Sequence, residues 1–207
     1  MKIIKPSFEI LTPISGIAVL KHLEACGRVC YKSESKTTEE SCIAFVKNLI
    51  KRGHKTAIEH FSISVRFVCD KGVSHEILRY HLASYCQEST RYCNYAKGGF
   101  NDEISVIEPL YLQSGTLGYE QWKSACEATE RAYYDLLTWG CTPQEARAVL
   151  PNSLKTEIVM TVNLREWRRF LKSGTAPTAH PQMRELVVPL LEKFKEIIPV
   201  IFDDIGE

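Results

Sequence analysis

The segment from Arg79 to Arg91 holds the densest set of side chains in this chain that could do chemistry. Besides the two arginines it contains hydroxyls at Ser84 and Ser89, an amide, a carboxylate and an imidazole. Arginine presents a planar fork of donors that matches phosphate, and serine hydroxyls can serve the remaining phosphate oxygens. Two arginines alone would most simply be solvated surface charges. The density of phosphate-binding groups around them instead favours an anion site.

A helix over about residues 73–83 is expected to deliver this segment to a fixed place, because apolar residues recur there at helical spacing. His75 and Arg79 are four residues apart, so one face of such a helix would present both to one ligand. The polar stretch that follows is expected to be an extended loop or strand. The apolar residues that support the helix are Val73, Ile77, Leu78 and Leu82.

The other elements are predicted from the same periodicities. Alternating patterns predict strands over residues 3–11, 61–69 and 156–162. Helical spacing predicts helices over about 17–31, from Thr37 to Gly53, and over 117–139, 143–149, 164–172 and 182–198. The strongest turn signal is residues 97–102. Since no repeat, low-complexity tract or linker interrupts it, the chain is expected to form one α/β domain over residues 1–207.

Composition limits the possible partners. The 207 residues are 44% hydrophobic, enough for one buried core, and 26 basic against 25 acidic residues give a net charge of +1. A nucleic-acid binder would normally show a basic excess, so no nucleic-acid partner is expected and anion recognition must be local. No apolar run reaches membrane-spanning length and residues 1–6 lack a signal-peptide core, which predicts a cytoplasmic protein without a membrane partner.

Eight cysteines invite a disulfide or a metal interpretation, but neither pattern is present. The chain has no Cys-x-x-Cys pair and no Cys/His grouping with zinc-ligand spacing, so no metal is expected. Free thiols in a reducing cytosol are the favoured interpretation. Cys26 and Cys30 share a helix face, a spacing that also serves simple packing.

The signature of the flavin-dependent thymidylate synthases is Arg-His-Arg-x-x-Ser-x-x-x-x-Ser-x-Arg, and this chain resembles it from Arg79 through Ser84 and Ser89 to Arg91. Three further segments resemble the family in the same order: Gly53-His54-Lys55-Thr56 with Glu59-His60, Ala146-Arg147-Ala148-Val149-Leu150-Pro151, and Thr161-Val162-Asn163-Leu164-Arg165. On these ordered matches, spread over about residues 25–200, the chain is identified as a member of the family. Membership implies an α/β (α+β) fold, a single domain with a central, mainly antiparallel sheet flanked by long helices.

The chain departs from the family pattern at two places. Arg79-Tyr80-His81 stands where the family has Arg-His-Arg. Gly174 stands where relatives carry an arginine, in a Leu-Arg-Thr setting before the Ala-His-Pro-Gln stretch of residues 179–182. In the family that arginine reaches the pyrimidine and is considered important for its activation. The departures therefore bear on the substrate and the rate, and leave the implied fold intact.

The resemblance implies a flavin site. It places His54 in the flavin and folate pocket as a catalytic residue, although a histidine there could instead only cap the preceding helix. Tyr80 keeps a ring that can stack on the flavin or pack in the core, and His81 keeps a donor but loses arginine's charge and fork. Arg169, four residues after Arg165, could be merely solvated. The implied cofactor-binding residues are Thr56 at the flavin's phosphates, Arg79, Tyr80, His81, Gln87, Asn163, Arg165 and His180.

The resemblance also implies a nucleotide site. Arg79 is expected to touch both flavin and nucleotide and counts as catalytic. Ser89 is implied to lie near the pyrimidine and joins the catalytic residues, but no Asp-His relay accompanies it, so it is interpreted as a binding group and not a nucleophile. Arg147 is the expected second cation. The implied substrate-binding residues are Glu76, Arg79, Ser84, Gln87, Glu88, Ser89, Thr90, Arg91 and Arg147.

The implied reaction is reductive methylation of dUMP to dTMP. Methylenetetrahydrofolate would supply the one-carbon unit and NADPH would reduce the bound FAD. Methylenetetrahydrofolate and NADPH are therefore the implied co-substrates, and FAD is the implied cofactor. Carbon 5 of uracil is a poor nucleophile, and nearby positive charge would stabilise the pyrimidine anion. The resemblance also implies a homotetramer with the flavin where subunits meet. Two alternatives stay open: a paralogue that modifies another pyrimidine nucleotide such as UMP, and a flavin- or nucleotide-binding protein without turnover.

Overall fold

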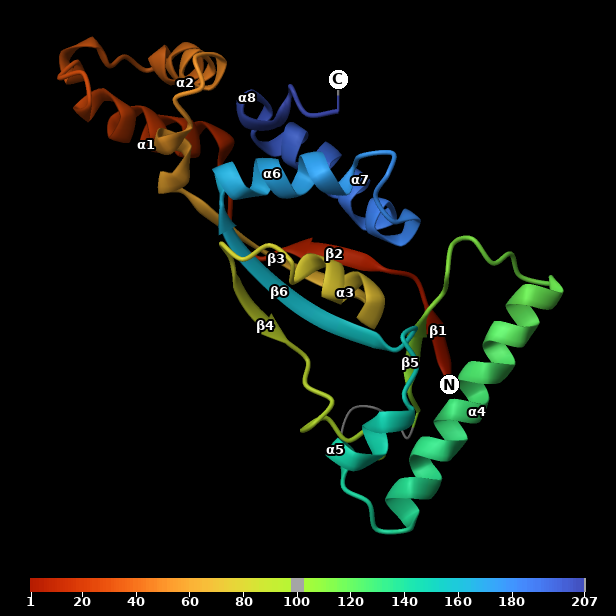
Figure 1. The fold of residues 1–207 in the computed structure, drawn as a ribbon. Helices are drawn as coiled ribbons and strands as arrows, with labels where there is room; N and C mark the ends of the chain where they lie inside the picture. The colour runs from red at the N-terminus through yellow and green to blue at the C-terminus, as the bar shows by residue number, and fades with distance from the viewer. Residues whose placement is uncertain (98–102, 207) are drawn as a thin grey trace. The chain divides into compact units, whose positions relative to one another are not determined.

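The computed structural model describes residues 1–97 and 103–206 (Figure 1). Most of the turn predicted at residues 97–102 therefore lies outside the described residues. The chain divides into two compact units. The first unit is Met1–Ser7, Arg66–Arg79 and Tyr85–Val159, and the second is Phe8–Val65, Tyr80–Ser84 and Met160–Glu207. The single domain expected over residues 1–207 stays a prediction.

One sheet holds four strands in the order β2-β3-β6-β4. These strands are β2 (Ser7–Ile10), β3 (Ser62–Asp70), β6 (Lys155–Asn163) and β4 (Ser84–Gln87). Within the second unit the amide of Leu164 donates to the carbonyl of Phe61 at 3.0 Å, and the hydroxyls of Ser64 and Thr161 lie 2.8 Å apart. The paired positions run in opposite directions, so β3 and β6 are antiparallel. The expected α/β (α+β) class with an antiparallel central sheet is confirmed.

The second unit is built on helices that bury a cluster of aromatic rings. Trp167 packs edge-to-face on Phe170 and on Phe194, with ring centroids 5.4 and 5.3 Å apart. Phe194 lies 5.0 Å from Phe202. The helices are α1 (Gly16–Val29), α2 (Ser41–Lys51), α6 (Leu164–Gly174), α7 (Pro181–Ile197) and α8 (Pro199–Phe202), with short 3-10 turns η1 (Glu34–Lys36) and η2 (Lys55–His60).

The first unit combines a small pair of strands with a long helix (Figure 1). β1 (Lys2–Ile4) pairs in parallel with β5 (Ser105–Ile107). The strand predicted over residues 3–11 is therefore two strands, broken at Lys5 and Pro6, because proline has no amide hydrogen for a ladder. The helices are α3 (Lys71–Ile77), α4 (Leu117–Thr138), α5 (Pro143–Ala146) and the 3-10 turn η4 (Arg147–Val149). One buried cluster comprises Tyr95, Ile104, Val106, Cys126, Tyr133, Ala146 and Leu154.

The helix before Arg79 is shorter than predicted. α3 ends at Ile77, so Arg79 lies beyond it, and the expectation that His75 and Arg79 share a helix face is wrong. In a longer helix the carbonyl of Ile77 would accept a hydrogen bond from the amide of His81. Here it accepts instead from the hydroxyl of Tyr85, at 2.8 Å. Leu82, expected on the buried face, is 73% exposed. Packing thus supports only the first part of the predicted helix.

Three features of the structure bear on partners. All eight cysteines are free thiols. No helix in the described part of the chain is long and apolar enough to cross a membrane. Residues 1–97 and 103–206 contain no group of three or more His, Cys, Asp or Glu that could hold a metal ion.

Candidate functional site

In the first unit, strand β4 fixes the amide of Gln87 against two hydroxyls. Its Nε2 donates to Ser74 Oγ at 3.0 Å and to Thr156 Oγ1 at 3.3 Å, and both partner residues are fully buried. Ser74 donates its own hydrogen to the carbonyl of Lys71 at 2.9 Å, so its oxygen can only accept from Gln87. This network assigns the NH2 group to the hydroxyls and leaves Oε1 of Gln87 without a donor among residues 1–97 and 103–206.

Lys71 donates to the same threonine. Its Nζ lies 3.1 Å from Thr156 Oγ1. Burial lowers the pKa of Lys71, and the negative charge of Glu88 offsets this only in part. The Thr156 hydroxyl oxygen therefore accepts from both Lys71 and Gln87. Because Lys71 is the first residue of α3, this contact links β6 to the start of that helix.

Glu88 sits in a half-buried network of charges. Lys155 Nζ donates to Glu88 Oε2 at 2.9 Å and to Glu157 Oε1 at 2.7 Å, and the Tyr95 hydroxyl donates to Glu88 Oε1 at 3.1 Å. Burial alone would lower the pKa of Lys155, but the hydrogen bonds and charges of Glu157 and Glu88 outweigh it, so the pKa is raised. Burial, and then Glu88, raise the pKa of Tyr95. Protein donors thus engage both oxygens of the Glu88 carboxylate.

A cavity of about 400 Å³ lies at this network. Its lining carries two cations and two carboxylates, so the charges balance. Arg66 Nη1 lies 3.8 Å from Glu157 Oε2. The lining residues are Arg66, Cys86, Gln87, Glu88, Lys155, Glu157 and Val159.

A turn after β4 carries the side chains predicted to bind phosphate. The carbonyl of Ser89 accepts from the amide of Tyr92 at 3.1 Å, and Ser89 Oγ accepts from the amide of Arg91 at 3.3 Å. Arg147 Nη1 donates to Thr90 Oγ1 at 3.3 Å. The structure thus brings Arg147 to the turn, and both arginines are exposed. We call residues 87–91 together with Arg147 the arm.

Arg79 lies just past α3 and is largely exposed. Its Nη1 donates to Glu76 Oε2 at 2.8 Å. An exposed pair of this kind contributes little to stability, so a ligand anion can replace the carboxylate. His81 and Ser84, which follow, are also exposed.

The second unit has a cavity of about 450 Å³ in which positive charge dominates. Asn163 in its lining is fixed as the N-cap of α6, because Oδ1 accepts from the amide of Glu166 at 3.0 Å. Arg165 Nη1 donates to Glu59 Oε1 at 2.5 Å. Four cations and two carboxylates line this cationic cavity: its residues are Lys55, Glu59, Leu82, Asn163, Arg165, Glu166, Arg168 and Arg169.

Two of these cations have further partners within the second unit. Arg168 donates to both carboxylate oxygens of Asp204 at 2.6 Å, and this bond lowers the pKa of Asp204. Arg169 Nη1 donates to Glu166 Oε1 at 3.1 Å, and its guanidinium lies 5.8 Å from the centroid of the Tyr80 ring. Arg169 is therefore not merely solvated.

Tyr80 packs against the aromatic cluster with one edge. Its ring centroid lies 4.9 Å from that of Phe170 at an interplanar angle of 68°. The residue is only partly buried. Core packing therefore accounts for one side of the ring, and the role of Tyr80 toward the flavin stays a prediction.

His54 follows a Schellman motif that ends α2. Gly53 adopts a φ of 76°, and the amide of His54 donates to the carbonyl of Leu49 at 2.9 Å. The backbone of His54 thus caps the helix, while its ring does not: Nδ1 lies 2.9 Å from the hydroxyl of Tyr31. Thr56, in η2, is exposed.

Gly174 and His180 both serve the helices. Nδ1 of His180 accepts from the amide of Gln182 at 3.3 Å at the start of α7. Gly174 ends α6, and a Cβ atom built on it would come within 2.9 Å of Val187 on α7. A larger side chain at residue 174 would therefore require Val187 to shift. The interpretation of Gly174 as the position of the relatives' pyrimidine-facing arginine stays a prediction.

Sequence reasoning missed several residues that hold these groups. The alternation predicted for residues 156–162 could have placed Thr156 on the buried face of β6. No local pattern distinguishes Lys71 and Tyr31, because their partners Thr156 and His54 come from distant segments. The roles assigned to the individual site residues stay predictions.

Comparisons with known proteins agree with the resemblance. The chain matches the family described as Thymidylate synthase complementing protein over residues 18–200. A flavin-dependent thymidylate synthase from Mycolicibacterium gilvum is 30% identical, with 96% of this chain and 84% of the relative covered. One from Geobacter sulfurreducens is 29% identical, with 92% and 86% covered.

A solved structure shares the fold. The UMP/dUMP methylase PolB from Streptomyces cacaoi, bound with 5-Br dUMP, matches with a TM-score of 0.76 at 21% identity, over 98% of this chain and 96% of that one. The family match extends over most of the sequence. The chain therefore belongs to the flavin-dependent thymidylate synthase family.

Proposed function

We propose that this chain catalyses the reductive methylation of dUMP to dTMP, with FAD as cofactor and methylenetetrahydrofolate and NADPH as co-substrates. The observation that carries the proposal is the arm. Arg91 and Arg147 are exposed at one turn, where Arg147 is held by Thr90. Two guanidinium groups at a turn suit a nucleotide phosphate, and charged hydrogen bonds of this kind are strong.

The cationic cavity fits the negatively charged diphosphate of FAD. Its lining has four cations and two carboxylates, and because Asp204 is bonded to Arg168, one positive charge remains in excess. Asn163 and Arg165 would hold the cofactor there, and Thr56 and Tyr80 would add contacts. When bound, FAD supplies the redox chemistry of the reaction. The remaining work falls to the chain's own groups, which bind and orient: Oε1 of Gln87 accepts from the nucleotide, and the guanidinium of Arg79 stabilises negative charge.

Methylation of UMP is the second candidate. It is favoured by the name of the structural relative, a UMP/dUMP methylase, and by the replacement of the signature's His and second Arg by Tyr80 and His81. Neither observation bears on the phosphate, which both nucleotides share.

Reoxidation of the flavin separates the candidates. The protein is reduced with NADPH under anaerobic conditions and given methylenetetrahydrofolate with dUMP or with UMP. We expect the oxidised flavin spectrum to return with dUMP, with one dTMP formed per flavin. Faster product formation from UMP would support the second candidate. A protein that binds nucleotide and flavin but forms no methylated product with either would be a binding protein.

Assembly is part of the proposal. We expect a cytoplasmic homotetramer, with FAD bound where subunits meet. Light scattering of the yellow protein tests this, and a stable monomer that retains FAD would contradict it.

A further inference from the structure

A hydrogen bond joins the end of α1 to the start of η2. The hydroxyl of Tyr31 lies 2.9 Å from Nδ1 of His54. Tyr31 is 54% exposed, so burial does not hold its ring in place. The exposed rings of Tyr31 and His54 can keep one geometry only if the backbone that carries each ring is fixed. Hydrogen bonds fix the backbone at both residues.

Tyr31 stands on the turn that ends α1, which is a second Schellman motif. The amide of Lys32 donates to Val29 at 3.4 Å and the amide of Ser33 to Arg28 at 3.3 Å. Lys32 takes the left-handed position with a φ of 47°, and it is the one non-glycine residue with a positive φ in the described part of the chain. A lysine there is disfavoured relative to glycine, so other contacts must hold the turn.

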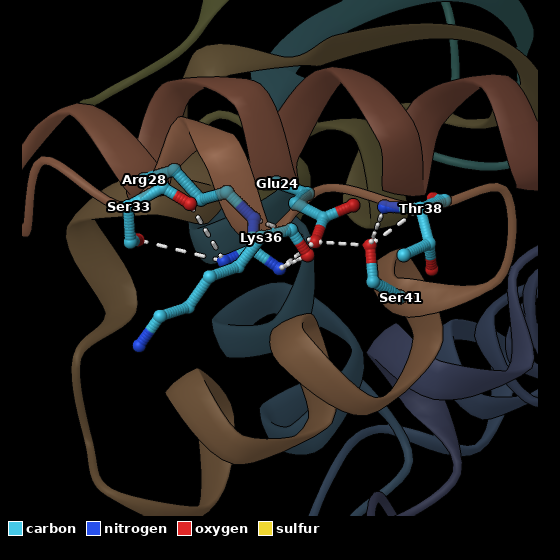
Figure 2. Close-up of polar contacts among 6 residues, drawn as sticks. All are labelled: Glu24, Arg28, Ser33, Lys36, Thr38 and Ser41. Atoms are coloured by element: carbon cyan, nitrogen blue, oxygen red, sulfur yellow. Dashed lines mark hydrogen bonds and ion pairs between the residues drawn. The ribbon is translucent and has the colours of Figure 1, made fainter.

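Those contacts come from Arg28 and Glu24, shown in Figure 2. Arg28 donates through Nε and Nη2 to Glu24 Oε1, at 2.8 and 2.5 Å, and both residues are buried. Nη1 of Arg28 reaches the carbonyl of Ser33, and Nη2 that of Lys36, each at 3.2 Å. Ser41 at the start of α2 donates to Glu24 Oε1 at 2.7 Å. One buried ion pair thus ties the Tyr31 turn to both helices.

His54 is fixed from its own side. The Schellman motif of α2 places its backbone, with the amide bonded to Leu49 at 2.9 Å. Within the described residues its Nε2 has no hydrogen-bond partner, whereas Nδ1 faces the Tyr31 hydroxyl. A phenol is the better donor of such a pair, and a neutral imidazole carries its single proton on the other nitrogen.

We propose that Tyr31 is a positioning residue for His54: its hydroxyl donates to Nδ1, which keeps the proton on Nε2 and presents a fixed N–H donor. Such a donor suits a carbonyl or carboxylate oxygen of the folate or the flavin. That choice of ligand rests on the proposed function, whereas the tautomer and the orientation of the ring do not.

Nitrogen NMR of the protein labelled with ¹⁵N-histidine tests the pair without any turnover. His54→Gln identifies the His54 signals among the six histidines. We expect the native protein at neutral pH to show His54 with Nε2 protonated and Nδ1 as an acceptor. Tyr31→Phe keeps the ring, removes the hydroxyl and should mix the tautomers of His54 alone. Tyr111→Phe, at a comparably exposed tyrosine of the first unit, serves as the control. A folded Tyr31→Phe protein with unchanged His54 signals would overturn the proposal.

A double-mutant cycle then tests the catalytic role. Tyr31→Phe should lower kcat/KM for methylenetetrahydrofolate about 3- to 10-fold, the effect of one hydrogen bond. In the His54→Gln background the same change should have no further effect. Equal losses in both backgrounds would show that Tyr31 acts independently of His54. If the native protein turns over neither dUMP nor UMP, the proposed function fails and the NMR result still decides the pair.

Discussion

The arm of the first unit and the cationic cavity of the second unit both gather charged side chains, but they hold them differently. In the arm, Gln87 is held by two fully buried hydroxyls and the side chain of Glu88 is only 11% exposed. In the cavity, the side chains of the Arg165–Glu59 pair are 52% and 38% exposed. A buried hydrogen bond is costly to lose, whereas an exposed ion pair contributes little.

The difference bears on how each region would meet the ligand proposed for it. The part of the arm formed by Gln87 and Glu88 keeps its geometry without a ligand, because buried or half-buried partners already hold both side chains. In the cavity the Arg165–Glu59 pair is open to water, so an incoming phosphate can replace the Glu59 carboxylate. Under the proposed function, the arm would select the nucleotide and the cavity would accommodate FAD, a large and flexible cofactor.

The sharpest test of this partition is to remove the two arginines of the arm one at a time. Arg91→Ala and Arg147→Ala should each weaken nucleotide binding about 10- to 100-fold, since charged hydrogen bonds contribute about 1.5–3 kcal/mol each. FAD affinity should change little in Arg91→Ala. Calorimetric titration with dUMP and flavin fluorescence measure the two affinities. Equal loss of both ligands in a folded variant would show that the partition is wrong.

Thr156→Val tests the buried side of the comparison. The change keeps the shape of the side chain but removes the acceptor for Lys71 Nζ and for the Gln87 amide. We expect a loss of about 1–3 kcal/mol in the free energy of unfolding, measured with urea. Thr129→Val is the matched control, because that hydroxyl is exposed on α4 and bonds only locally to Ala125. If Thr129→Val loses as much stability as Thr156→Val, burial of the Thr156 hydroxyl does not explain the loss.

Glu59→Gln tests the exposed side. It breaks the ion pair with Arg165, and we expect the free energy of unfolding to change by less than about 1 kcal/mol. Because Arg165 is released, FAD affinity should stay the same or rise, whereas Arg165→Ala should lower it. Flavin fluorescence separates these outcomes. A destabilisation as large as that of Thr156→Val would mean that the cavity is as rigid as the arm.

The smallest expected effect is a dependence of stability on alkaline pH. The pKa of Lys155 is raised in the folded protein, so its contribution is fully present below the ordinary lysine value near 10.4 and is lost as pH rises through the higher folded value. Urea unfolding at pH values above about 10 should therefore show stability that falls as the pH rises. Lys155→Gln should flatten this fall, and an unchanged slope would show that another group causes it.

Elements that depend on local pattern were predicted well. The strands predicted over residues 61–69 and 156–162 are β3 and β6 to within one residue at each end, and the helix predicted over residues 182–198 is α7. Alternation and helical spacing report which side chains one face of an element must bury, and burial of one face is what stabilises that element. The ordered motifs likewise identified the family, because a motif consists of residue types at fixed spacings in the sequence and needs no knowledge of contacts in space.

Contacts between distant segments were decided only by the tertiary structure. α3 ends where the hydroxyl of Tyr85 takes the carbonyl of Ile77, and Gly174 is small because Val187 packs against it. Tyr31 meets His54 across 23 residues of chain. The sequence by itself determined the fold class and the family, and it supplied the candidate site residues. It could not determine which donor meets which acceptor, because hydrogen bonds and close packing act over a few ångströms of space and residue spacing does not encode that distance.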